Sequence, residues 1–169
     1  GFKPQPFIDA FPGNQCGGVR LEYAVEPEPL DTGGAIAFAA RFAGVSHTFI
    51  VVNGDVLTSL DVSTLVAFHK NNAAEGTLHL TPVEDPSQFG VVETASDGLV
   101  TRFVEKPAPE ETTSFNVNAG TYVLEPSVID RIAVNQKMSI ERVVFPAMVA
   151  QGTLFAMPTN DSWVDTGRP

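Results

Sequence analysis

One acidic side chain stands where an apolar strand should end. Residues 49–57 read FIVVNGDVL, so four apolar residues run directly into Asn53, Gly54 and Asp55. An Asn-Gly turn would by itself explain the polar residues. A carboxylate at the tip of a buried strand is also suited to hold a divalent cation, because Mg²⁺ prefers oxygen ligands. Both interpretations of Asp55 are open at this point, and the elements that position it have to separate them.

The strand before Asp55 belongs to a chain in which strands and helices alternate early and hairpins follow later. Alternating and continuous apolar runs predict strands, and apolar residues at i, i+3, i+4 and i+7 predict helices. The run at 47–53 is typical of a strand buried on both faces. Strands are predicted at 19–25, 47–53, 76–83, 89–93, 99–106, 118–126 and 153–157, and helices at 33–43, after Asp61 and after Ser139.

The last two helices have predictable caps and buried faces. Asp61 is predicted to cap a helix, and Ser139 to begin another that Pro146 kinks. The inner positions follow from the helical period. They are Val62, Leu65, Val66 and His69 in the first helix and Ile140, Val143, Val144 and Ala147 in the second.

These elements predict one α/β domain with a mixed, largely parallel sheet. In sheets of this kind, ligands bind beyond the carboxyl ends of the strands. Asp55 lies at such an end, which gives a bound cation a location, and the interpretation as a plain turn stays open.

The bulk composition is that of an ordinary globular domain. The chain has 169 residues, 43% hydrophobic and 18% charged, which is enough to bury a core. A net charge of −10 disfavours nucleic acid and anionic membranes as partners, and no apolar stretch reaches the roughly 18–20 residues of a membrane span. A small phosphorylated ligand remains compatible, because a bound metal and a local lysine can invert the sign of a pocket. Cys16 is the single cysteine, which predicts a reducing, cytoplasmic compartment.

Four segments, taken in order, resemble the sugar-1-phosphate nucleotidyltransferases, and most closely the mannose-1-phosphate guanylyltransferase branch. They are EPEPLDTGGAI (26–36), VVNGD (51–55), FVEKP (103–107) with NAG (118–120), and WVDTG (163–167). The resemblance implies a Rossmann-like nucleotidyltransferase fold and the transfer of a nucleotidyl group from a nucleoside triphosphate to a sugar 1-phosphate. It implies Mg²⁺ as cofactor, GTP and mannose 1-phosphate as the expected substrates, and leaves assembly into a homo-oligomer open.

The same resemblance assigns roles to particular residues. Asp55 and Asp165 match the two metal-ligating aspartates, against the alternatives of a turn and a capping aspartate. Glu105 and Lys106 match a motif that binds the sugar hydroxyls and the sugar phosphate, against the alternative of a surface ion pair. Neighbouring strand residues point to opposite faces, so both can reach one ligand only if the strand ends there, as Pro107 suggests.

Further matches concern the sugar and the base. Asn118 would bind sugar hydroxyls, Gly120 would allow close approach, and Gly90 would contact the sugar through its backbone. The nucleotide loop matches at Leu30, Thr32, Gly33 and Gly34, which would lie against the base. Asp31 departs from the pattern, because the family has glycine there; if that glycine has a positive φ, a side chain could force another backbone angle.

The family's glycine-rich loop G-G-x-G-T-R-L, which holds the triphosphate, does not occur in this sequence. We therefore expect residues 1–169 to be a nucleotidyltransferase domain that lacks its first β-α-β segment, is incomplete at both ends, and is inactive in isolation. A non-catalytic regulatory homologue that binds the same ligands is the alternative. A dinucleotide oxidoreductase is disfavoured, because no G-x-G-x-x-G opens a helix after a strand.

Overall fold

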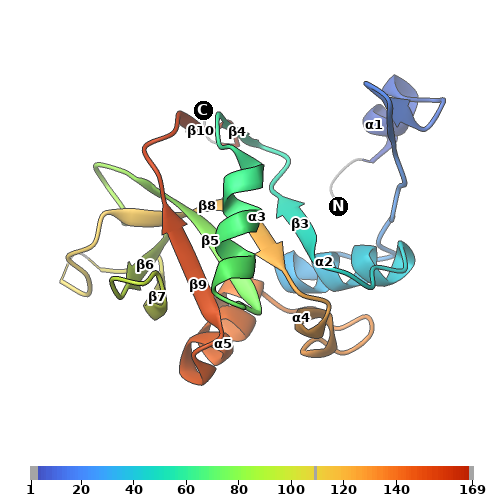
Figure 1. Cartoon of the computed structure of the whole chain (residues 1–169). Coiled ribbons are helices and arrows are strands. Elements are labelled where there is room, and N and C mark those ends of the chain that lie inside the picture. Colours follow the sequence, from blue (N-terminus) through green and yellow to red (C-terminus); the bar gives the residue numbers. More distant parts are fainter. Residues whose placement is uncertain (1–3, 109, 168–169) are drawn as a thin grey trace.

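The computed structural model describes residues 4–108 and 110–167, so both ends of the predicted 1–169 domain lie outside the described part. The chain forms an α/β fold around one six-stranded sheet, which confirms the predicted class (Figure 1). Among the described residues, no helix is both long and apolar enough to cross a membrane. The helices are α1 (Gln5–Ala10), α2 (Asp31–Phe42), α3 (Val62–Asn71), α4 (Ser127–Asp130), the π-turn η1 (Ile140–Val144) and α5 (Phe145–Gln151). The strands are β1 (Gln15–Cys16), β2 (Val19–Arg20), β3 (Phe49–Val52), β4 (Val56–Thr58), β5 (Gly76–Pro82), β6 (Gly90–Thr94), β7 (Val100–Glu105), β8 (Asn116–Leu124), β9 (Leu154–Pro158) and β10 (Trp163–Asp165).

The main sheet is mixed, but its pairing corrects the expectation of a largely parallel sheet. The strand order is β7-β6-β8-β5-β9, with β3 paired to β8 as well. β5 and β9 are parallel, whereas β8 runs antiparallel to β3, β5 and β6, and β6 and β7 form an antiparallel hairpin. A continuous apolar run indicates that both faces of a strand are buried, and it carries no information about the direction of its neighbours.

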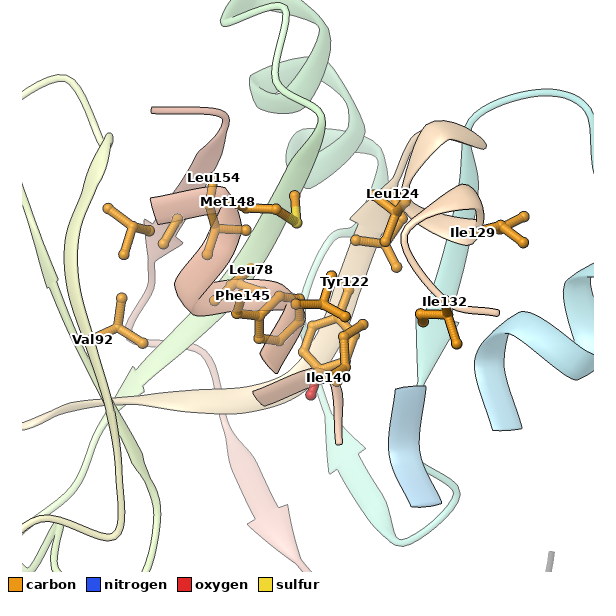
Figure 2. Packing of buried hydrophobic residues seen from close by; sticks show 14 of the residues in the cluster. Leu78, Val92, Tyr122, Leu124, Ile129, Ile132, Ile140, Phe145, Met148 and Leu154 are labelled. Carbon is orange, nitrogen blue, oxygen red and sulfur yellow. The ribbon is translucent and has the colours of Figure 1, made fainter. Parts of the chain in front are cut away.

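The two faces of the sheet are covered by different helices. The larger core lies between the sheet and α2, α4, η1 and α5, and Figure 2 shows Tyr122 and Phe145 packed together in it. Their ring centroids are 5.3 Å apart in an edge-to-face arrangement. A smaller cluster of Leu60, Leu65 and Val123 lies beneath α3. Asp61 caps α3 as predicted, since its side chain accepts a hydrogen bond from the Ser63 amide.

The helix after Ser139 begins where predicted but buries a different face. Ser139 caps it by accepting a hydrogen bond from the Arg142 amide. The first turn is a π-turn, which accommodates one extra residue before α5 continues. After Ile140, each buried position therefore lies one residue later in the sequence than the regular helical period predicts. The buried positions are Ile140, Val144, Phe145 and Met148, so the prediction of Val143 and Ala147 was wrong.

Two predicted strands differ from the structure. β3 is not buried on both faces, because Ile50 and Val52 have exposed fractions of 45% and 53%. The predicted strand at 19–25 is limited to Val19–Arg20, which pairs with the two-residue strand Gln15–Cys16. In both cases the apolar pattern was read correctly as extended chain, but the neighbours that would cover it are not set by local sequence.

Two histidines are buried beneath the α3 face of the sheet. His69 Nδ1 lies 2.9 Å from Thr77 Oγ1, and His69 Nε2 lies 3.0 Å from the Glu125 carboxylate. His79 Nε2 lies 2.8 Å from Thr159 Oγ1, while its Nδ1 is buried with no hydrogen-bond partner among the described residues. The second histidine therefore has little to stabilise a positive charge.

Acidification should destabilise the fold through His79. Burial lowers the pKa of His79 below 6.5, with Asp161 acting in the opposite direction. As the pH falls below 6.5, the unfolded chain binds a proton that the folded chain does not, so stability present above that pH is lost. We expect the free energy of unfolding in urea to fall by up to about 1.4 kcal/mol per pH unit in this range.

The matched variants are His79→Gln and, at an exposed position, His47→Gln. The first should flatten the pH dependence of the unfolding free energy, and the second should leave it as in the parent. A His79→Gln protein with the parental pH dependence would contradict the assignment.

Candidate functional site

Asp55 and Asp165 lie side by side although they are far apart in the sequence. β4 and β10 form an antiparallel ribbon in which Asp165 pairs with Val56 (Figure 1). Thr166 closes the ribbon, since its amide and hydroxyl donate to the Asp55 carbonyl at 2.7 and 2.8 Å. A Cβ added to Gly167 would stand 2.6 Å from Asp55 Oδ2 and 3.2 Å from Asp165 Oδ1. The two carboxylate oxygens are therefore no further apart than the sum of these two distances.

This geometry suits a divalent cation shared with substrate. The two carboxylates converge on the position that a side chain of residue 167 would take, which we call the notch, and the Gly167 amide donates to Asp165 Oδ1 at 2.9 Å. Within residues 4–108 and 110–167, no group of three or more histidine, cysteine, aspartate or glutamate side chains gathers around one point. Mg²⁺ is commonly held by one or two carboxylates together with substrate phosphates, so a pair of aspartates fits it. The liganding role of Asp55 and Asp165 remains a prediction.

β7 ends between Glu105 and Lys106, so the alternation of side chains along the strand does not continue to Lys106. β7 ends at Glu105, and Lys106 has a left-handed φ of 52°. The Lys106 amide donates to the Phe89 carbonyl at 2.9 Å. Gly90 pairs with Glu105, and a Cβ there would stand 2.8 Å from Glu105 Oε2. The condition under which both side chains can approach one ligand, a strand that ends between them, is met.

Asn118 and Gly120 lie in β8, next to the strand that leads to Asp55. Asn118 Nδ2 donates to the Tyr122 hydroxyl at 2.9 Å, and Asn118 Oδ1 accepts from the Gly120 amide at 3.1 Å. Burial raises the pKa of Tyr122, so its hydroxyl stays protonated. Gly120 has a φ of 74°, and a Cβ there would lie 2.7 Å from Asn53 Nδ2. Glycine is therefore required at this position for both its angle and its space.

The glycine pair of the predicted nucleotide loop is packed against another part of the chain. Gly33 and Gly34 are buried, and both of their amides donate to the Met138 carbonyl, at 2.8 and 3.1 Å. A Cβ on Gly34 would meet the Gln136 carbonyl oxygen at 2.4 Å. The two glycines thus have a structural function at the start of α2, and their contact with a base remains a prediction.

Thr32 and Leu30 flank this packing. Thr32 Oγ1 donates to Glu141 Oε2 at 2.5 Å and accepts from the Ile140 amide at 3.0 Å, while Leu30 is buried. Asp31 keeps a left-handed φ of 62°, and its carboxylate accepts a hydrogen bond from the Thr32 amide. A side chain in place of the expected glycine therefore does not move this residue out of the left-handed region.

A groove runs from Thr32 to Gly54, the residue before Asp55. It has a volume of about 720 Å³ and lies between α2 and β3. Thr32 and Glu141 line it on one side, and Asn53 and Gly54, which immediately precede Asp55, line it on the other. The groove is mostly apolar, which is typical of a pocket for a small molecule with a few polar contacts. Of the predicted base contacts, Thr32 lines the groove, and the other end of the groove lies at Gly54, next to Asp55.

Several residues beside the predicted site were not singled out for it from the sequence. Thr166 and Gly167 follow Asp165 directly and shape the notch between the carboxylates. Tyr122 orients Asn118. The WVDTG segment contained the signal for the first two, whereas nothing in the local pattern pairs Tyr122 with Asn118.

Comparison with known proteins identifies relatives along almost the whole chain. A family model described as nucleotidyl transferase matches residues 5–169. Mannose-1-phosphate guanylyltransferase catalytic subunit beta of Drosophila pseudoobscura pseudoobscura is 44% identical over 153 residues, covering 90% of this chain and 40% of that protein. Mannose-1-phosphate guanylyltransferase of Mycobacterium tuberculosis (strain ATCC 25618 / H37Rv) is 40% identical over 170 residues, covering 99% of this chain and 46% of that protein. The chain thus spans less than half the length of these relatives.

Solved structures share the fold. HddC from Yersinia pseudotuberculosis superposes with a TM-score of 0.81 at 27% identity, covering 99% of this chain and 71% of that one. A second structure of HddC is a complex with GMP-PN and has a TM-score of 0.80. The likeness supports a Rossmann-like nucleotidyltransferase fold for this chain.

The packing of Gly34 yields a direct test. In Gly34→Ala, the new methyl would lie 2.4 Å from the Gln136 carbonyl oxygen and 2.7 Å from Leu30 Cβ, so the backbone must move. We expect a loss of at least about 2 kcal/mol in the free energy of unfolding, measured in urea. Gly13→Ala is the control, because no atom lies within 4 Å of its added methyl. A Gly34→Ala protein as stable as Gly13→Ala would contradict the structural role.

Proposed function

The chain belongs to the nucleotidyl transferase family, and on that basis we propose that the protein transfers a guanylyl group from GTP to mannose 1-phosphate. The products are GDP-mannose and pyrophosphate, with Mg²⁺ as the cofactor. The observation that carries this proposal is the convergence of the Asp55 and Asp165 carboxylates on one notch at Gly167, at the end of the β4·β10 ribbon. The names of the relatives support the choice of sugar and base.

The reaction needs two polyanions to meet in line. An oxygen of the sugar phosphate attacks the α-phosphorus of the nucleotide, the bond from that phosphorus to the bridging oxygen breaks, and pyrophosphate leaves. Positioning and charge neutralisation therefore matter more than covalent chemistry on the protein. Mg²⁺, when bound by Asp55 and Asp165, would neutralise phosphate charge and orient the reacting oxygens.

The sugar phosphate would bind at the β7 end and along β8. Lys106 is exposed and would meet the phosphate as a point charge. Glu105 lies over Gly90, where its carboxylate can accept hydrogen bonds from sugar hydroxyls. Asn118 is oriented by Tyr122 and Gly120 and would contribute its amide to the same sugar. The side chains proposed for this substrate thus come from β7 and β8, which are separated in the sheet by β6, the strand that carries Gly90.

The nucleotide would bind along the groove between α2 and β3. Its predicted base contacts, Leu30, Thr32, Gly33 and Gly34, lie at the start of α2, and its phosphates would approach Asp55 past Gly54. The complex of HddC with GMP-PN is consistent with a guanine nucleotide in this fold. We place the reaction in the cytoplasm, in keeping with the single free cysteine.

Removal of either carboxylate should abolish transfer. We expect Asp55→Asn and Asp165→Asn each to lower kcat by at least about 100-fold, because each removes a charged ligand from the proposed cation. The measurement is pyrophosphate release by the protein expressed from its complete natural reading frame, with GTP, mannose 1-phosphate and Mg²⁺. Asp97→Asn is the control, since Asp97 lies in a surface turn where the variant keeps an oxygen for the Leu99 amide.

Near-parental rates in either site variant would show that the metal assignment is wrong. Binding of both substrates by a parent protein without turnover would instead favour the regulatory homologue.

Loss of the lysine charge should act on the sugar phosphate alone. We expect Lys106→Gln to raise the KM for mannose 1-phosphate at least about tenfold, since a hydrogen bond to a charged group contributes about 1.5–3 kcal/mol. The KM for GTP should change by less than about twofold, because Lys106 does not line the groove proposed for the nucleotide. Lys70→Gln, on the exposed side of α3, is the matched control. Equal effects on both substrates would exclude the proposed contact.

A further inference from the structure

We propose that Trp163 is a positioning residue that sets the spacing of the two carboxylates through a bulge in β8. This inference rests on the proposed metal role of Asp55 and Asp165. In this proposal Trp163 contacts neither the cation nor the substrates. Its hydrogen bond to β8 helps to fix the distance between the Asp55 and Asp165 carboxylates, which come from segments far apart in the sequence.

The bulge lies where β5 and β8 change register. Leu78 pairs with Tyr122 and Leu80 pairs with Asn118, so one β5 residue faces three residues of β8. Gly120 lies in this interval with a left-handed φ of 74°. A bulge of this kind bends its strand and takes backbone groups out of the regular ladder. The Ala119 carbonyl, which lies within this interval, binds a side chain from outside the sheet.

Two consecutive carbonyls of the bulge hold the two aspartate segments. The Gly120 carbonyl accepts from the Asn53 amide at 2.8 Å, which continues the β3·β8 register by one residue beyond Val52, and Asn53 precedes Asp55 by two residues. The Ala119 carbonyl accepts from Trp163 Nε1 at 2.9 Å, and Trp163 precedes Asp165 by two residues. Each carboxylate is thus tied to neighbouring atoms of one strand. The separation of the carboxylates depends on both ties.

The tie to Trp163 is the more direct of the two. Side chains two residues apart in a strand lie on the same side, so the Trp163 ring and the Asp165 carboxylate move together with β10. The indole N–H is the single polar group of that ring and can only donate. Ala119 is fully buried, so its carbonyl would have difficulty finding water as a substitute. Loss of the donor therefore leaves an unsatisfied carbonyl and loosens β10.

Trp163 also contacts the sugar-phosphate side of the site. Its ring meets Phe89 edge to face, with centroids 5.8 Å apart. The Phe89 carbonyl accepts the amide of Lys106, the proposed phosphate-binding residue. One side chain thus touches the supports of both halves of the proposed site, which supports a role in alignment.

The test is divalent-cation affinity, measured without turnover. The purified protein is titrated with Mn²⁺ in the absence of substrates, and free Mn²⁺ is followed by electron paramagnetic resonance. Trp163→Phe keeps an aromatic ring against Phe89 but cannot donate to Ala119. We expect its Mn²⁺ dissociation constant to rise about tenfold, the usual lower range for loss of a residue that orients metal ligands.

Phe89→Leu is the matched control, because it removes the ring contact and keeps the Ala119 hydrogen bond. Its Mn²⁺ affinity should change by less than about threefold. If the parent binds Mn²⁺ and Trp163→Phe binds it equally well, the positioning role is overturned while the metal assignment stands. If the parent binds no Mn²⁺, or Asp55→Asn and Asp165→Asn bind it as the parent does, the metal assignment itself fails.

A second measurement uses the parent protein alone. Trp163 is the single tryptophan, so its fluorescence reports on this position without interference. The protein is titrated with Mg²⁺, which is not paramagnetic, and the tryptophan emission should shift as Mg²⁺ binds. The dissociation constant from the fluorescence titration should equal the one that Mg²⁺ gives in competition with Mn²⁺. Emission that is insensitive to a cation known to bind would contradict the coupling, even if Trp163→Phe failed to fold.

Discussion

β8 is the strand against which the rest of this sheet is placed. It is buried along most of its length and pairs with β3, β5 and β6, so a change in its register would displace three neighbours at once. The interruption at Gly120 is therefore not a local defect. At this point β8 binds β3 through the Gly120 carbonyl, which continues the β3·β8 register, and binds Trp163, outside the main sheet, through the Ala119 carbonyl. Because β8 is held by its neighbours on both sides, the positions of the Ala119 and Gly120 carbonyls are fixed relative to the sheet.

The charge balance of the chain is consistent with this arrangement. Two carboxylates that are held close together repel each other, and the net charge of −10 adds to that repulsion. The β4·β10 ribbon holds them together through backbone hydrogen bonds and through Thr166. These hydrogen bonds offset the electrostatic repulsion between the two carboxylates. A cation shared with phosphates would remove the repulsion, and Lys106 supplies positive charge on the other side of the proposed site. The acidic character of the protein thus favours ligands that arrive with a metal.

Much of the site was visible in the sequence, and the reasons are physical. A carboxylate after an apolar run, a strand end before proline and a cap at Asp61 are local features, and each of the three elements lies where predicted. Three features were not predictable from local pattern. The direction of β8, the π-turn that shifts the face of the last helix, and the exposed side of β3 all depend on neighbours that lie far away in the sequence. The hydrogen bond from Trp163 to Ala119 belongs to the same class, because it joins two segments that are not neighbours in any predicted element.

At the start of α2, glycines that resemble a ligand-binding motif are explained by packing within the chain. Glycines in a loop that resembles a nucleotide-binding motif suggest close approach of a ligand, but here Gly33 and Gly34 already meet backbone atoms of residues 136–140. Asp31 keeps the left-handed angle that glycine would adopt without strain, and its own carboxylate binds the next amide. The loop geometry is therefore fixed by contacts within the chain before any ligand binds. A base that enters the groove would meet a surface that is already formed, so its binding would not have to include the free energy of ordering this loop.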